Sequence, residues 1–129
     1  MVEATRDNHS VLFGNVAALR QAMHDCAQDS LQHNEERAAQ AYLFWADQLA
    51  DVQRGASLGE LFADLEFVYR QATAMAVQAR RGDEAQVSLA SVHVAHMVAR
   101  ALRPDLGEDE IQDQVLESLA RRDEELDEE

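Results

Sequence analysis

The segment from Asp83 to Leu102 constrains the fold of this chain most, because its apolar residues are not confined to one stripe of a helix. In a helical register they fall on two separate faces, one formed by Val87, Ala90, Val94, Val98 and Ala101 and the other by Leu89, Val92 and Ala99. A helix that is apolar on most of its sides must be surrounded by other elements. The segment is therefore predicted to be a central helix.

Amphipathic segments flank this helix on both sides. Apolar residues at helical spacing predict helices from Ser10 to Ala27, from about Leu31 to near Gly55, from Ser57 to Arg81 and from Glu108 to Arg121. The 129 residues include only one Pro and five Gly, and 47% are hydrophobic, which favours helix throughout. We therefore predict an all-α, single-domain bundle of four to five helices around a central helix near residues 83–102.

Several local signals predict where the helices begin and end. Ser10 is a plausible first cap, and residues 57–60 (Ser-Leu-Gly-Glu) match a capping box, in which the Ser and Glu side chains satisfy open backbone donors. Asp83 with Gln86 is a weaker capping pair for the central helix. Gly82 is predicted to end the helix before it, and Pro104 to end the central helix.

Negative charge is concentrated at the C-terminus. The chain has a formal net charge of −14, of which residues 105–129 carry −10, with twelve acids and two Arg. Residues 1–122 are predicted to form the bundle and residues 123–129 an acidic, solvated and mobile tail. A body of this charge has no electrostatic footprint for phosphate backbones, so direct nucleic-acid binding is not expected.

The sequence also bears on location and redox state. No stretch reaches the roughly 18 apolar residues needed to cross a bilayer, and the first ten residues contain no apolar signal region. We expect a cytoplasmic protein without membrane contact. The single cysteine, Cys26, lies in an apolar helical register and is expected to be a buried, reduced thiol.

No catalytic constellation is evident. No Ser, Cys and His residues stand at spacings that would activate a nucleophile, and no glycine loop is present to bind a phosphate. We therefore predict neither an enzyme nor a bound cofactor. His93 and His96, three residues apart on one side of the central helix, are either core or interface histidines or, alternatively, ligands of a metal or cofactor that also needs carboxylates from a facing helix.

Two aromatic residues lie out of phase with the apolar faces of their helices. Phe44 shares a side with Arg37 and Asp47, and Phe67 shares one with Glu60 and Asp64. Either a neighbouring helix covers these rings, or they form a surface for a partner or for a second copy of the chain, because aromatic residues are enriched at interfaces.

These features together predict a non-enzymatic protein–protein interaction module, such as an adaptor, assembly subunit, inhibitor or chaperone, with a homodimer as a further possibility. Its partner-binding residues are predicted to be Phe44 and Phe67 together with the acids of the tail, which would contact a basic surface on a protein partner. Those acids are Asp123, Glu124, Glu125, Asp127, Glu128 and Glu129.

Overall fold

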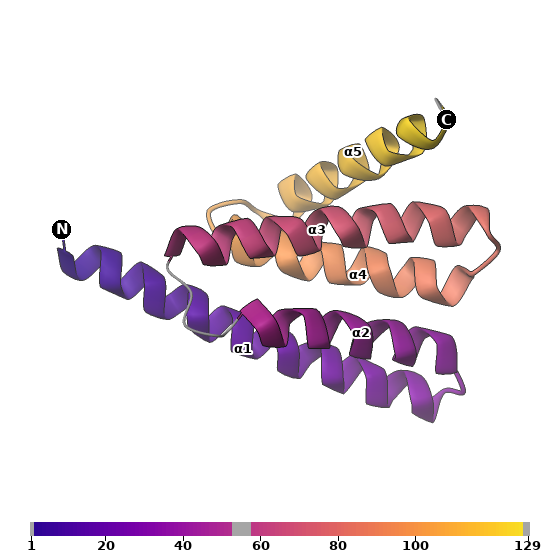
Figure 1. Ribbon diagram of the computed structural model, residues 1–129, viewed down its shortest axis with the longest axis horizontal. Coiled ribbons are helices and arrows are strands. Elements are labelled where there is room, and N and C mark those ends of the chain that lie inside the picture. The colour runs from indigo at the N-terminus through magenta and orange to yellow at the C-terminus, as the bar shows by residue number, and fades with distance from the viewer. Residues whose placement is uncertain (1, 53–57, 128–129) are drawn as a thin grey trace.

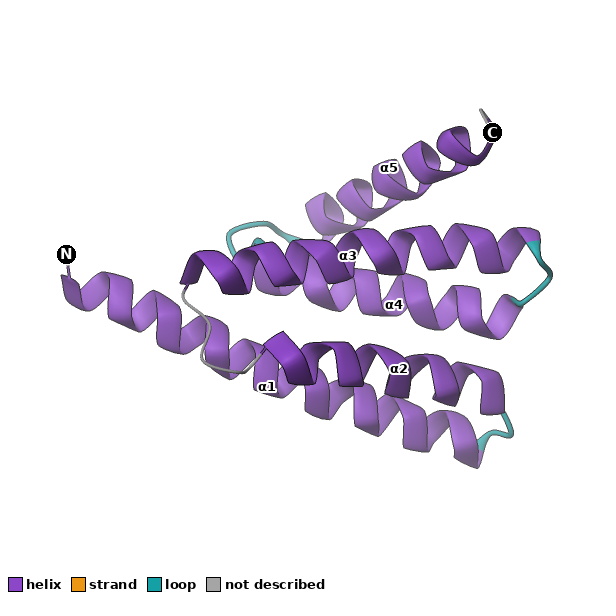
Figure 2. Cartoon of the chain, viewed as in Figure 1, coloured by secondary structure: helices purple, strands orange, loops and turns teal. Residues whose placement is uncertain are grey.

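The computed structural model describes residues 2–52 and 58–127, and within them the side chains of residues 16–49, 60 and 62–127. The described residues form five helices and no strand, which confirms the predicted all-α class (Figure 2). The helices are α1 (Val2–Gln32), α2 (Glu36–Val52), α3 (Leu58–Arg81), α4 (Ala85–Leu102) and α5 (Glu108–Asp127). Within this part of the chain, no helix is both long enough and apolar enough to span a bilayer.

Two antiparallel helical hairpins make up most of the bundle (Figure 1). α1 pairs with α2, and α3 pairs with α4, so that α2 and α3 form the layer nearest the viewer while α1 and α4 lie behind them. α5 packs against both helices of the second hairpin. α4 contacts all four other helices, as α3 also does, and nine of its residues are buried, which confirms the central helix predicted from the apolar pattern.

The core runs between the two hairpins and continues beneath α5. Its fully buried side chains come from every helix and include Met23, Leu49, Leu65, Val94 and Ile111. The polar groups buried with them have partners, since the Ser88 hydroxyl donates to the Ala76 carbonyl at 2.8 Å and the Thr73 hydroxyl to the Arg70 carbonyl at 2.9 Å. Each hydrogen bond removes the penalty that an unpaired buried hydroxyl would carry.

The outer side of α4 departs from the prediction that this helix is apolar on most sides and therefore surrounded. Leu89, predicted to face a neighbouring helix, is 71% exposed, and Val92 is only partly buried. Leu89, His93 and Arg100 follow one another at spacings of four and seven residues, so they share one exposed side of α4, which α2 contacts at His93 and α5 at Arg100. α4 is thus central by its contacts, yet it keeps one stripe facing solvent.

Both hairpins turn through the same backbone motif. After α1, the Glu35 N–H donates to the Ser30 carbonyl at 2.8 Å and the Asn34 N–H to the Leu31 carbonyl at 3.2 Å, with Asn34 left-handed at φ 61°. After α3, Glu84 and Asp83 donate to Ala79 and Arg80 in the same way, with Asp83 at φ 58°. This is the Schellman motif. Its left-handed residue is Asp83, and the predicted end of this helix at Gly82 is confirmed, because α3 ends at Arg81.

The predicted capping pair of α4 does not form, since its N-cap is Glu84 and carries no side-chain capping bond. Gln86 instead accepts a hydrogen bond from the backbone N–H of Ala38 at 3.3 Å, and Arg37 pairs with Glu84 at 2.6 Å. These contacts satisfy a donor at the open N-terminus of α2 and join the two hairpins. Asp83 cannot serve as a cap because its backbone completes the preceding turn.

The other helix boundaries agree with the sequence prediction for the start of α3 and the end of α4 and differ from it for α1 and α5. α1 begins at Val2 and continues through Ser10 to Gln32, because neither Gly nor Pro interrupts residues 2–10. α3 begins at Leu58 and α4 ends at Leu102, both as predicted, although Ser57 of the capping box and Gly55 lie outside the described residues. α5 begins at Glu108 but runs to Asp127, six residues beyond the predicted end at Arg121.

Candidate functional site

Phe44 lies on α2 at the rim of a small hollow between the two hairpins. Its side chain is 48% exposed and meets Trp45 edge to face, with ring centroids 4.9 Å apart and planes at 77°. Trp45 itself is buried and donates its indole N–H to the Ser91 hydroxyl at 3.4 Å. The hollow has a volume of about 200 Å³ and is lined by Arg37, Gln40, Ala41, Phe44, Trp45, Met75 and Val87.

Phe67 lies on α3 and is 59% exposed, so neither aromatic ring is covered by a neighbouring helix. It does not line the hollow beside Phe44, although Met75, eight residues further along α3, does. Each ring has an exposed carboxylate three residues away on its own helix, Asp47 for Phe44 and Asp64 for Phe67. Positive groups lie near the same rings, since the exposed Arg70 is also three residues from Phe67 and Arg37 lines the hollow with Phe44. Both phenylalanines lie on the two helices nearest the viewer in Figure 1.

The acidic C-terminal segment differs from the predicted solvated tail, because residues 123–127 continue α5 and contact α3. Arg81 pairs with Asp123 at 2.7 Å and with Asp127 at 2.7 Å, and Arg80 lies 3.2 Å from Asp123. The two carboxylates are four residues apart and so face the same way on the helix. We call Arg80, Arg81, Asp123 and Asp127 the arginine clamp. The hydrogen bond from Arg81 holds the pKa of Asp123 below its usual value.

The other acids of this segment have different surroundings. Glu125 pairs with Arg122 within α5 at 3.0 Å, and Glu124 is exposed. Glu128 and Glu129 lie outside the described residues. Of the predicted tail contacts, Asp123 and Asp127 thus already have a basic partner within the same chain.

His93 and His96 lie on the outer side of α4, where His93 contacts α2. The Tyr42 hydroxyl is 2.7 Å from His93 Nδ1, and the two rings meet edge to face. Partial burial lowers the pKa of both histidines, and the positive charge of Arg100 lowers it further. Among the described residues, no group of three or more His, Cys, Asp or Glu is arranged to hold a metal ion.

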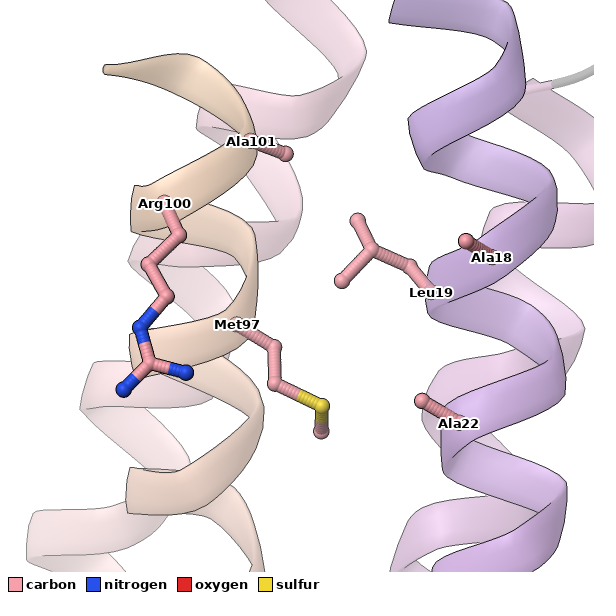
Figure 3. Close-up of a pocket in the computed structure, with 6 residues that line it drawn as sticks. All are labelled: Ala18, Leu19, Ala22, Met97, Arg100 and Ala101. Carbon is pink, nitrogen blue, oxygen red and sulfur yellow. The ribbon is translucent and has the colours of Figure 1, made fainter. Parts of the chain in front are cut away.

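A groove between α1 and α4 is a feature that the sequence pattern did not predict. It has a volume of about 370 Å³, and Leu19 and Met97 extend into it from opposite helices (Figure 3). Ala18 and Ala22 line the α1 side, and their small side chains leave the space unfilled. Cys26, one turn beyond Ala22, is partly buried, and burial raises the pKa of its thiol, in keeping with a protonated, unreactive thiol.

Comparisons of the chain with models of known protein families, with curated proteins and with solved structures found no match.

Proposed function

We propose that this protein is a non-enzymatic, helical protein–protein interaction module whose partner binds the outer surface of α2 and α3 around Phe44 and Phe67. The observation that carries this proposal is the exposure of Phe44 beside the hollow. Phe44 packs edge to face against the buried Trp45, and 48% of its surface remains exposed. A rigid aromatic side chain beside a recess is typical of the residues that contribute most binding energy at interfaces.

The charge around the two rings indicates what kind of partner fits. Asp47 and Asp64 are exposed one helical turn from Phe44 and Phe67, and the whole chain carries a net charge of −14. A second copy of this chain would bring like charges together around the same rings, which costs binding energy. A partner that presents apolar side chains next to Lys or Arg is complementary to both features.

The acidic end of α5 would contribute to the same interaction over a longer range. Glu124 is exposed, and the arginine clamp holds the segment that carries it against α3. Exposed charges of this kind accelerate association and make it sensitive to salt, while adding little to the affinity of the docked complex.

The proposal is tested by affinity capture from a native lysate with the full chain, comparing the wild type with a Phe44→Asp, Phe67→Asp double variant. Leu89→Asp is the matched control, because Leu89 is more exposed than either ring but lies on α4. We expect a stoichiometric, basic partner that the wild type and Leu89→Asp retain and the double variant loses, with all three chains equally helical by circular dichroism.

Two results would contradict the proposal. One is a partner retained equally by the double variant, which would place the interface elsewhere. The other is a wild type that captures nothing at low salt and has the mass of a monomer in solution. A wild-type dimer that Phe44→Asp converts into monomers would show instead that the surface binds a second copy, against the charge argument.

A further inference from the structure

The largest described pocket outside the proposed interface lies between α3 and α5. It has a volume of about 470 Å³, within the range of small-molecule sites. Four arginines line it, Arg70 on α3, Arg103 after α4, and Arg121 and Arg122 on α5. Two glutamates, Glu66 and Glu117, also line it. The charges of the residues that line it sum to +2, although Asp105 and Glu125 lie beside them and pair with Arg103 and Arg122.

Two of these arginines have donors that no carboxylate of the described residues uses. Arg70 has no ion-pair partner there, and the Nε of Arg122 is buried without a hydrogen-bond partner, although its Nη1 contacts Glu125 at 3.0 Å. A buried donor without an acceptor costs free energy that an oxygen atom bound beside it would recover.

The other two arginines are held by weak or local pairs. Arg121 lies 3.4 Å from Glu117 in its own helix, and both side chains are mostly exposed. Arg103 holds Asp105, two residues away, through two hydrogen bonds of 3.0 and 3.1 Å, so its donors are already engaged. The exposed pair of Arg121 contributes little, so an oxyanion can replace it at small cost.

The other residues that line the pocket supply two hydroxyl groups and an apolar surface. The Tyr69 hydroxyl is 2.7 Å from the Ser118 hydroxyl and 3.4 Å from the Gln114 carbonyl, which places two hydroxyl groups within the pocket wall. Phe62, which is 38% exposed, and Leu102 supply apolar surface. A ligand that fits this lining has a strongly charged oxyanion at one end and an apolar group at the other.

We propose that the pocket between α3 and α5 binds a small organic phosphate monoester, with Arg70 and Arg122 as the principal contacts of the phosphate group. A dianionic phosphate can accept hydrogen bonds from Arg70 and Arg122, because planar guanidinium groups suit its oxygen atoms. No residue that lines the pocket also lines the hollow beside Phe44, but Glu66 and Arg70 lie one and three residues from Phe67 on α3, so the pocket adjoins the Phe67 side of the proposed partner surface.

The test is calorimetric titration of the full chain with phenyl phosphate and, in a second arm, with inorganic phosphate. We expect saturable binding of phenyl phosphate that weakens with added salt, and at least several-fold weaker binding of inorganic phosphate, which cannot use the apolar side. Arg70→Gln and Arg122→Gln should each weaken the binding of phenyl phosphate about tenfold or more. Arg37→Gln, which removes an arginine outside this pocket, is the matched control and should leave it unchanged.

A variant with tighter binding distinguishes the loss of a binding residue from damage to the fold. Glu66→Gln removes a carboxylate from the lining and should tighten the binding of phenyl phosphate, which damage to the fold would not do. The proposal is overturned if phenyl phosphate does not bind at millimolar concentration. It is equally overturned if Arg70→Gln, Arg122→Gln and Glu66→Gln all leave the affinity unchanged. Equal binding of inorganic phosphate and phenyl phosphate would overturn the ester as ligand and assign the site to free phosphate.

Discussion

The Tyr42 hydroxyl lies 2.7 Å from Nδ1 of His93, and this contact joins the two hairpins across α2 and α4. Burial raises the pKa of Tyr42 to about 12, so the hydroxyl stays protonated at neutral pH. It donates to Nδ1 when the imidazole is neutral and carries its proton on Nε2.

Tyr42→Phe should therefore destabilise the bundle and change the titration of His93. Losing the hydrogen bond should lower the free energy of unfolding by about 1 kcal/mol. The pKa of His93 should rise, because the hydroxyl favours the neutral ring. Urea unfolding and an NMR titration of the imidazole measure the two effects. His96 is the internal control, since it makes no contact with Tyr42 among the described hydrogen bonds, and an unchanged pKa of His93 would contradict the assigned donor.

The lowered pKa values of His93 and His96 predict that mild acid destabilises the fold. Between the lowered folded-state pKa and the ordinary value of 6.5, the unfolded chain binds more protons than the folded one. The stabilisation is therefore fully present above pH 6.5 and is lost as the pH falls through the folded-state pKa. Arg100→Gln should raise both histidine pKa values and flatten the decline in stability from pH 7 to 5, measured by urea unfolding. An equally steep decline in this variant would show that Arg100 has no part in it.

The turn after α3 allows a direct comparison of two neighbouring residues. Gly82 does not need positive φ, and an added Cβ would meet its nearest neighbour, the Gln78 carbonyl oxygen, at an ordinary 3.5 Å. Gly82→Ala should therefore cost nothing or stabilise slightly, whereas Asp83→Ala, which removes the short polar side chain that tolerates φ 58°, should cost about 1 kcal/mol. Thermal unfolding measures the stability of the two variants. A larger loss of stability for Gly82→Ala than for Asp83→Ala would contradict the assignment of Asp83 as the left-handed residue.

The sequence predicts those parts of this fold that depend on local pattern. The apolar residues on several sides of 83–102 identify the central helix, and Pro104 marks its end, because both effects act within a few residues. Local pattern did not identify the left-handed residue of the turn after α3, since Asp83 tolerates positive φ through its short polar side chain and stands next to Gly82, the more common residue at such positions.

Features that depend on packing could not be read from spacing. Arg81 and Asp123 are 42 residues apart, and nothing in the charge run 123–127 distinguishes acids that meet an arginine from acids in water. The pocket between α3 and α5 could not be predicted for the same reason, because Arg70, Arg103 and Arg122 come together only when α5 packs against α3. The exposure of Phe44 and Phe67 could not be predicted either, because helical phase alone does not say whether another helix covers a side chain.

The attachment of α5 should depend on very few apolar contacts. Ile111 and Val115 are its buried residues among those described, while Leu116 is 55% exposed. Ile111→Ala should lower the free energy of unfolding by about 2–5 kcal/mol, because it leaves a cavity between α5 and the α3–α4 hairpin. Leu116→Ala removes a side chain of the same size from the same helix and should change the stability by less than about 0.5 kcal/mol. Equal losses in denaturant unfolding would show that α5 does not pack as described.

The distal half of α5 should respond to the arginine clamp. Arg81→Gln removes the ion pairs of Arg81 with Asp123 and Asp127 and leaves the longer Arg80–Asp123 pair, so amide exchange in residues 118–127 should become faster while the rest of the bundle keeps its protection. Added salt should accelerate exchange of this segment in the wild type but much less in the variant, because these exposed pairs are screened. Arg121→Gln is the control, since its ion pair lies within α5.

Acid should release the same segment at a pH set by Asp123. Because Arg81 lowers the pKa of this carboxylate, the clamp is fully formed above the ordinary value of 3.8 and is lost only as the pH falls through the lowered folded-state value. Asp123→Asn should therefore reproduce the fast exchange of residues 118–127 at neutral pH and remove its dependence on acid. Protection that is unchanged in both Arg81→Gln and Asp123→Asn would mean that apolar packing alone holds α5, and that its acids are available to a basic partner without first leaving α3.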